Sequence, residues 1–410
     1  MGQVAHRAAL PWAVVAMDRR SEEGRDPALD AAALDAAAID TARQDHVTLV
    51  DATLVDATDW PAERWDRLAV WSPAGHAFQS HAWGELKRPL GWTPRRFVVE
   101  LGGNTVAAVS FQERNLAPRL PGPLGKRTYL YVPRGPILLE DSAAAARAAL
   151  DGLRALARKR RAAILTIDPA WPPDGPLAAE LSRAGFRPAA RDVQVSRTAT
   201  LVPLLADEGE QHRLVRKSTA NLINRARREG AAAERIDLAN AHPADQDRAL
   251  GEMHDLLVAT ARREGIVLRG RDYQLAQWRA LGEAGIAWLW FGRVGDRRWT
   301  GSLLLRCGAT LHQYQAGSAD DADLRAVPAN HLLQWEIVRW AAAAGFKHYD
   351  LGGVDARNAR GLPRDDRHPL WNLYLFKRGF GAEGVEFVRA HEYAPNPFVR
   401  AAWRLARRLR

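Results

Sequence analysis

The same order of apolar segments occurs twice along the chain, and this duplication limits the possible folds more than any other feature. In each copy a strand-like apolar run precedes a helical segment, and a second strand-like run carrying or followed by an aspartate comes after it. The intervals agree closely, since Leu130 to Asp168 spans 38 residues and Tyr314 to Asp350 spans 36. This spacing is typical of a mixed sheet flanked by helices. The sequence therefore predicts an α/β (α+β) fold that is present twice.

The expected elements follow from the apolar runs and from the glycines and prolines between them. In the first copy we expect strands at 106–111, 129–139 and 163–167, and a helix at 142–161. In the second copy we expect strands at 301–306, 311–317 and 346–351, and a helix at 329–344. A basic helix is expected between the copies, at 212–230.

A chain of 410 residues exceeds the roughly 250–300 residues that one core usually supports, so two domains are expected. Residues 1–60 are rich in Ala and Asp and have no clear apolar period, which predicts a poorly ordered extension. We place the first domain at 61–200 and the second at 201–395. A short basic helix at 396–410 would end the chain, either solvated or against an anionic membrane face or tRNA.

Charge is distributed unevenly along the chain. Residues 18–66 hold 13 acidic and 5 basic residues although the whole chain has a net charge of +10, so the remainder is strongly basic. The positive electrostatic potential of such a basic region attracts phosphate-bearing partners, although an arginine-rich composition can also reflect a GC-rich genome. Cys307 is the single cysteine, and no histidine pair has metal-ligand spacing, so we expect neither a disulfide nor a metal site. No run of 18 apolar residues is present.

Four segments, in order, resemble the Fem family, the tRNA-dependent aminoacyltransferases that build peptidoglycan cross-bridges. FQSHAWGELK at 78–87 resembles its opening signature and LYLFKRGFG at 373–381 its C-terminal one, and both are fairly specific. YVPRGP at 131–136 and the basic segment at 219–230 are weaker matches. The family's Arg-aromatic-Asn-Ile-Arg run is replaced by ANLIN at 220–224. The long helical arm of some members also has no counterpart, so the chain resembles the compact members.

The resemblance implies two tandem acetyltransferase-like (GNAT-type) domains and an aminoacyltransferase. Its donor would be aminoacyl-tRNA. Its acceptor would be the stem-peptide amine of a peptidoglycan precursor, either UDP-MurNAc-peptide or lipid II. We expect a cytoplasmic monomer that contacts at most the inner face of the plasma membrane.

The implied reaction is aminolysis of the ester between the amino acid and the tRNA. Because this ester is already activated, the reaction needs no enzyme nucleophile, metal or cofactor. A fixed cation can stabilise the oxyanion that develops, and by resemblance Lys377 supplies it and faces the tRNA 3′ end. Asp350 would orient or deprotonate the attacking ammonium. The simpler alternatives are a surface lysine on a strand and an aspartate that caps a turn.

The resemblance also implies contacts to the acceptor phosphates. Lys87 would hold them, with Trp83 four residues earlier on the same helical face. Arg263 would grip diphosphate oxygens in a bidentate manner, and Arg262 is an equal alternative. Lys87 could instead extend along an amphipathic helix without a ligand.

Two aromatic residues complete the candidate site. Tyr314 would hydrogen-bond the acceptor peptide, although such tyrosines are often only half-buried packing residues. Phe376 would stack on the terminal adenosine of the tRNA, since every base offers a π-face.

Two other functions stay open at this point. An acyl-CoA-dependent N-acyltransferase of the same fold is one, although the loop at 324–330 before the second-copy helix has no glycine to approach a pyrophosphate. A non-catalytic RNA- or membrane-binding module is the other, and it would bind in proportion to total charge.

Overall fold

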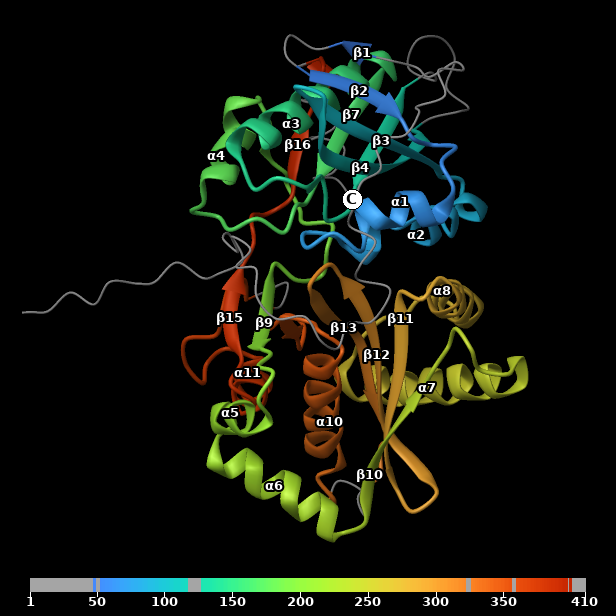
Figure 1. Cartoon of the computed structure of the whole chain (residues 1–410), viewed down its shortest axis with the longest axis vertical. Coiled ribbons are helices and arrows are strands. Elements are labelled where there is room, and N and C mark those ends of the chain that lie inside the picture. The colour runs from blue at the N-terminus through green and yellow to red at the C-terminus, as the bar shows by residue number, and fades with distance from the viewer. Residues whose placement is uncertain are drawn as a thin grey trace, which may run out of the picture. The chain divides into compact units, whose positions relative to one another are not determined.

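The computed structural model describes residues 47–48, 52–116, 127–321, 326–355, 359–396 and 398–399, and most of its elements are labelled in Figure 1. These residues form two sheets. The predicted N-terminal extension lies outside the described residues up to residue 46 and at 49–51. Most of the predicted basic helix at 396–410 also lies outside them.

The first sheet is antiparallel except for one parallel pair, β5 and β7. Its strands in spatial order are β1 (Val47–Thr48), β2 (Ala52–Asp56), β3 (Thr93–Leu101), β4 (Asn104–Asn115), β5 (Thr128–Val132), β7 (Ala162–Ile167), β16 (His391–Tyr393) and β8 (Arg187–Pro188), with β6 (Ile137–Leu138) paired to β4. Helix α3 (Ala143–Lys159) lies between the two parallel strands in sequence. Ser142 caps this helix by accepting from the Ala145 N–H at 3.1 Å.

The second sheet repeats this arrangement, with β13 and β14 as its parallel pair. Its strands in spatial order are β10 (Ala231–Ile236), β11 (Ala287–Val294), β12 (Arg297–Cys307), β13 (Thr310–Ser318), β14 (His348–Asp350), β9 (Thr198–Pro203) and β15 (Glu383–Glu386). Helix α10 (Ala329–Ala343) separates β13 from β14 in sequence, as α3 separates β5 from β7. The predicted fold class, a duplicated mixed sheet flanked by helices, is confirmed.

The remaining helices precede or cover these sheets. They are α1 (Ala62–Ala69), η1 (Ala77–Gln79), α2 (His81–Glu85), η2 (Arg88–Leu90), α4 (Pro176–Arg183), α5 (Glu208–Leu214), α6 (Lys217–Arg228), α7 (Pro243–Glu264), α8 (Arg271–Glu283) and α11 (Trp371–Arg378). The single basic helix expected at 212–230 is interrupted after Leu214. There the Arg216 N–H donates to the Gly379 carbonyl at 2.9 Å, so the break ties the start of α6 to the end of α11.

The chain crosses between the two sheets twice. Consecutive strands β8 and β9 belong to the first and second sheets, and β15 and β16 return in the opposite direction. The second sheet therefore begins at Thr198, three residues before the sequence places its domain, and the first sheet takes a strand from 391–393. Strand β2 likewise lies within the stretch expected to be poorly ordered, where Leu54 and Val55 are buried.

One apolar cluster contains side chains from both halves of the chain. Trp65, Phe78 and Trp83 come from the first half, and Met253 and Trp278 come from α7 and α8. Separate clusters lie around α3 and around α10. The shared cluster holds the segment at 76–87 against β13 and α8, and this contact positions the candidate site.

Candidate active site

The segment at 76–87 is fixed by buried hydrogen bonds. The Gln79 amide donates to the carbonyl oxygens of Ser110 at 3.0 Å and Pro133 at 2.6 Å, and it accepts from the Ser110 N–H at 2.7 Å. Ser80 caps α2 by accepting from the Trp83 N–H at 3.0 Å. These two polar residues therefore fix the N-terminal end of α2, and the C-terminal end of the helix lies at the candidate site.

A buried arginine anchors the same helix to β3. Arg96 is 1% exposed, and its guanidinium donates to Glu85 Oε1 at 2.6 Å and to the His81 carbonyl at 3.2 Å. The charge-assisted bonds to Arg96 and Arg88 lower the pKa of Glu85, which outweighs the opposing effect of its partial burial. This ion pair sets where the chain leaves α2, and so where Lys87 begins.

Lys87 lies just after α2, and its side chain contacts two aromatic rings. Its Nζ lies 4.3 Å from the centroid of Trp83 and 5.1 Å from that of Tyr273, and it also hydrogen-bonds the Tyr273 hydroxyl. Burial, with a smaller effect of the Arg269 charge, lowers the pKa of Lys87 to about 8. Lys87 and Trp83 thus meet as their spacing predicts, and Tyr273 of α8 joins them.

Tyr314 lies beside this group because β13 contains a bulge. Leu303 pairs with Gln315 and Leu304 with Gln313, which leaves Tyr314 as the extra residue. Its ring meets Phe78 edge-on at 5.7 Å and Trp83 edge-on at 6.1 Å. Burial raises the pKa of Tyr314 to about 12, so its hydroxyl stays protonated, and it makes one long hydrogen bond to Gln277 Oε1 at 3.4 Å.

Asp350 ends β14 and is held from several sides. Its Oδ1 accepts from the N–H groups of Thr200 at 3.1 Å and Gly352 at 2.8 Å, and its Oδ2 lies 2.7 Å from His312 Nδ1. Burial raises the pKa of Asp350, but His312, the Gly352 N–H and Lys377 together bring it below its ordinary value. The carboxylate is therefore ionised and fixed.

Lys377 lies on α11 and not on a strand, and its side chain is buried at 4% exposure. Its Nζ donates to the carbonyl oxygens of Gly352 at 2.8 Å and Gly353 at 2.9 Å. Burial lowers the pKa of Lys377 to about 8, against the opposing effect of the Asp350 charge. An ammonium has three N–H donors, so one remains without a partner among the described residues.

The structure thus places the predicted residues in two neighbouring groups. Lys87, Trp83 and Tyr314 form the aromatic group, and Lys377 and Asp350 form the lysine group with His312. His76 connects them, because its ring lies 4.7 Å from that of Phe78 and 6.5 Å from that of His312.

Two predicted residues lie apart from both groups. Phe376 packs edge-on against His331 at 5.0 Å and Phe380 at 5.3 Å, so its ring belongs to the apolar cluster around α10. Arg263, near the end of α7, donates to Ser318 Oγ at 3.1 Å and pairs with Glu264. Among the described residues, neither side chain has a hydrogen bond, ion pair or ring contact with the side chain of Lys377 or Lys87.

Sequence reasoning missed His312 and Tyr273 as site residues. His312 lies two residues before Tyr314 on the same strand, and this was the available signal. Tyr273 gave no signal, because its approach to Lys87 depends on how α8 packs against α2.

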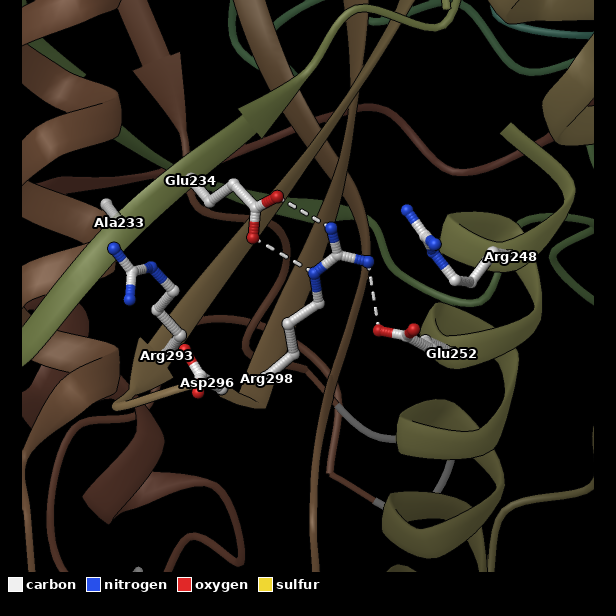
Figure 2. A pocket seen from close by; sticks show the side chains of 7 residues that line it. All are labelled: Ala233, Glu234, Arg248, Glu252, Arg293, Asp296 and Arg298. Atoms are coloured by element: carbon white, nitrogen blue, oxygen red, sulfur yellow. Dashed lines mark hydrogen bonds and ion pairs between the residues drawn. The ribbon is translucent and has the colours of Figure 1, made fainter. Parts of the chain in front are cut away.

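Two hollows lie outside these groups. One, of about 600 Å³, is lined by residues of β10, β11, β12 and α7. Figure 2 shows that Arg298 within it donates to both Glu234 and Glu252. Its central cation is already paired, so it offers little to an anion. The other, of about 490 Å³, is lined by the loop at 359–369 and includes Arg364 and Arg367.

The basic hollow at 359–369 is joined to the lysine group through Asp355. That carboxylate accepts from Arg360 Nη1 at 2.8 Å and from Thr198 Oγ1 at 3.0 Å, and the Val354 N–H donates to Thr198 Oγ1 at 2.8 Å. The side chains of Arg364 and Arg367 are exposed and have no hydrogen bond or ion pair to described residues.

Neither a metal cluster nor a membrane span is found in the part of the chain that the structure describes. No three His, Cys, Asp or Glu side chains there could hold a metal ion together. No helix there is long and apolar enough to cross a membrane.

Comparison with known proteins agrees with the duplicated fold. The FemAB family model matches residues 62–175, and the acetyltransferase (GNAT) domain model matches 216–360. The lipid II:glycine glycyltransferase of Staphylococcus aureus (strain MRSA252) is 21% identical over 407 residues, covering 81% of this chain and 91% of its own. The enzyme of the same name from strain USA300 is also 21% identical, and the match covers 79% of this chain and 89% of that enzyme.

The solved structure of FemX has the same fold. It superimposes with a TM-score of 0.69 at 18% identity, covering 89% of this chain and 99% of FemX. The duplicated sheets, the two family models and the glycyltransferase relatives point to one assignment. The chain is an acyltransferase built from two acetyltransferase-like domains, the first of which matches the FemAB family over residues 62–175.

Proposed function

We propose that the chain transfers an amino acid from aminoacyl-tRNA to the stem-peptide amine of a peptidoglycan precursor. The new amide would extend a cross-bridge, and the reaction would take place in the cytoplasm, where charged tRNA is available. The glycyltransferase relatives, whose name specifies lipid II as acceptor, support this class of reaction.

The observation that carries the proposal is the buried ammonium of Lys377. Two of its three donors are fixed by the Gly352 and Gly353 carbonyls, and the third is left for an oxyanion. A preorganised donor of this kind stabilises the charge that develops on the ester carbonyl oxygen during aminolysis. The amino acid arrives as an ester, so the attack requires no metal and no covalent intermediate.

The two groups suit the two substrates. The aromatic group would hold the acceptor, with Lys87 on its diphosphate and the Tyr314 hydroxyl on its peptide. The unpaired guanidinium groups of Arg364 and Arg367 would meet the phosphodiester backbone of the donor near the lysine group. UDP-MurNAc-peptide and lipid II share the diphosphate, so both acceptors fit this arrangement.

An acyl-CoA-dependent N-acyltransferase is the second candidate, and the acetyltransferase domain match favours it. The loop at 324–330 before α10 contains no glycine, which disfavours close approach of a pyrophosphate to the backbone. The two candidates therefore differ in donor and share the lysine group.

The test is transfer of label by the purified full-length chain. Charged tRNA carrying labelled amino acids, or labelled acetyl-CoA, is incubated with UDP-MurNAc-peptide or with lipid II in detergent, with and without a chelator. The proposal expects label from tRNA on one of these acceptors and no effect of the chelator. Label from acetyl-CoA alone would establish the second candidate instead.

A further inference from the structure

The His312 ring is oriented by a carboxylate that is itself fixed. Asp350 uses Oδ1 for the Thr200 and Gly352 N–H groups, which leaves Oδ2 to meet His312 Nδ1 at 2.7 Å. The lowered pKa of Asp350 keeps it ionised, and an ionised carboxylate only accepts hydrogen bonds. Nδ1 must therefore carry the proton of the neutral imidazole, and Nε2 carries the lone pair.

Nε2 is free to act on a substrate. It has no hydrogen-bond partner among the described residues, and the His312 side chain is 23% exposed. A buried structural histidine normally satisfies both ring nitrogens, so a single oriented nitrogen left open is the arrangement of a base.

His312 lies between the two groups that would hold the substrates. On one side its partner Asp350 is also a neighbour of Lys377, through the turn at Gly352. On the other side the His76 ring lies 6.5 Å from His312 and leads to Phe78 and the aromatic group. An amine held by the aromatic group would pass His312 on its way to an ester held at Lys377.

We infer that His312 is the general base that takes the proton from the acceptor amine, with Asp350 as the positioning residue that fixes its tautomer. This inference rests on the proposed function. As the amine nitrogen attacks the ester carbonyl carbon, a C–N bond forms and the C–O bond to the ribose breaks. The proton lost by nitrogen moves to His312 Nε2 and is then delivered to the ribose oxygen, which leaves as a hydroxyl.

The charged groups around His312 are compatible with this role. The charged groups near its ring are the Asp350 carboxylate on β14, which lies 2.7 Å from Nδ1, and the Lys377 ammonium on α11, which is a neighbour of Asp350. From the first half, burial and then the charges of Arg134 and His312 lower the pKa of His76 well below its ordinary value. His76 therefore stays neutral, and a change in rate on the acid side is not due to it.

The closing experiment compares His312→Gln and His312→Asn with wild type, adds His312→Ala for rescue by imidazole, and uses His348→Gln as the matched control. His348 lies at the other end of β14 from Asp350, outside both groups. Transfer is followed from pH 5.5 to 8.5 with aminoacyl-tRNA and, in a second arm, with acetyl-CoA. Melting temperatures and KM values show whether each variant is folded and binds its substrates.

We expect both His312 variants to lose about 10²- to 10⁴-fold in kcat with KM little changed, and to have a dependence of rate on pH that differs from that of wild type. His348→Gln should behave as wild type. Added imidazole should partly restore His312→Ala, an effect that a purely structural histidine would not produce.

Each other outcome has one meaning. A His312→Gln variant with near wild-type kcat and pH profile would overturn the base and leave the proposed function intact. Loss of transfer from acetyl-CoA in that variant, with no transfer from tRNA by wild type, would keep the base and overturn the proposed donor. Absence of transfer by wild type from either donor would contradict both.

Discussion

The Lys377 ammonium lies 2.8 Å from the carbonyl oxygen of Gly352, and the N–H of the same glycine lies 2.8 Å from Asp350 Oδ1. One peptide turn therefore holds the cation and the carboxylate of the site together. Gly352 has φ of +85°, a conformation that side chains rarely adopt, so the turn depends on glycine. The relationship links the proposed oxyanion donor to the proposed base through the backbone.

Replacing Lys377 by Met should stabilise the protein at neutral pH. The pKa of Lys377 is lowered from 10.5 to about 8, so folding holds an ammonium where it is disfavoured. The cost, about 3 kcal/mol, is complete below pH 8 and disappears as pH rises to about 10.5, where the unfolded chain also loses the proton. Denaturant unfolding at pH 7 and pH 10 measures the difference in the free energy of unfolding between Lys377→Met and wild type. A stability gain that is equal at both pH values would contradict the burial of a charged lysine.

The two arginine partners of Glu85 should differ in their effect on stability. Glu85→Ala leaves Arg96, at 1% exposure, without its anion and should cost about 3 kcal/mol. Arg88→Gln removes only the exposed partner, which is 51% exposed, and should change stability by less than about 1 kcal/mol. Chemical denaturation compares the two variants. Equal effects would show that the Arg96 pair does not anchor α2.

Lys87→Met should weaken acceptor binding and leave donor binding unchanged. Loss of one phosphate contact predicts a rise of about 10-fold in KM for the diphosphate-bearing acceptor, with kcat little altered. Lys347→Met is the control, because that lysine is exposed and belongs to neither group. A fall in kcat with an unchanged KM would instead place Lys87 in the chemical step.

The pair Arg364→Gln and Arg367→Gln should weaken tRNA binding and reduce its dependence on salt. Two lost phosphate contacts predict a salt slope smaller by about 2 and a several-fold higher Kd near physiological ionic strength. The double variant Arg248→Gln and Arg293→Gln makes the same charge change at the hollow in Figure 2. Equal weakening by both double variants would mean that binding follows total charge alone.

The duplicated fold could be predicted from the sequence because each element carries a local signal. The buried strand β7 reads AAILTI and is apolar on both faces, and α3 follows a serine cap. The spacing of Trp83 and Lys87 also predicted their contact, which survives although α2 ends at Glu85.

The composition of the lysine group could not be predicted in the same way. His312 and Asp350 are 38 residues apart and meet only because β13 and β14 pair in parallel with that register. The location of Lys377 on a helix, with its ammonium turned inward, depends on the turn at Gly352. Phe376 was placed on the tRNA by resemblance, whereas its ring packs beside Phe380.

The central claim is that the buried ammonium of Lys377 stabilises the oxyanion of the transferred aminoacyl group. The most direct measurement is the single-turnover rate of amide formation with saturating aminoacyl-tRNA and acceptor, in wild type and in Lys377→Met. The account predicts a fall of about 10²- to 10³-fold with unchanged tRNA affinity. A Lys377→Met rate within about threefold of wild type would contradict it.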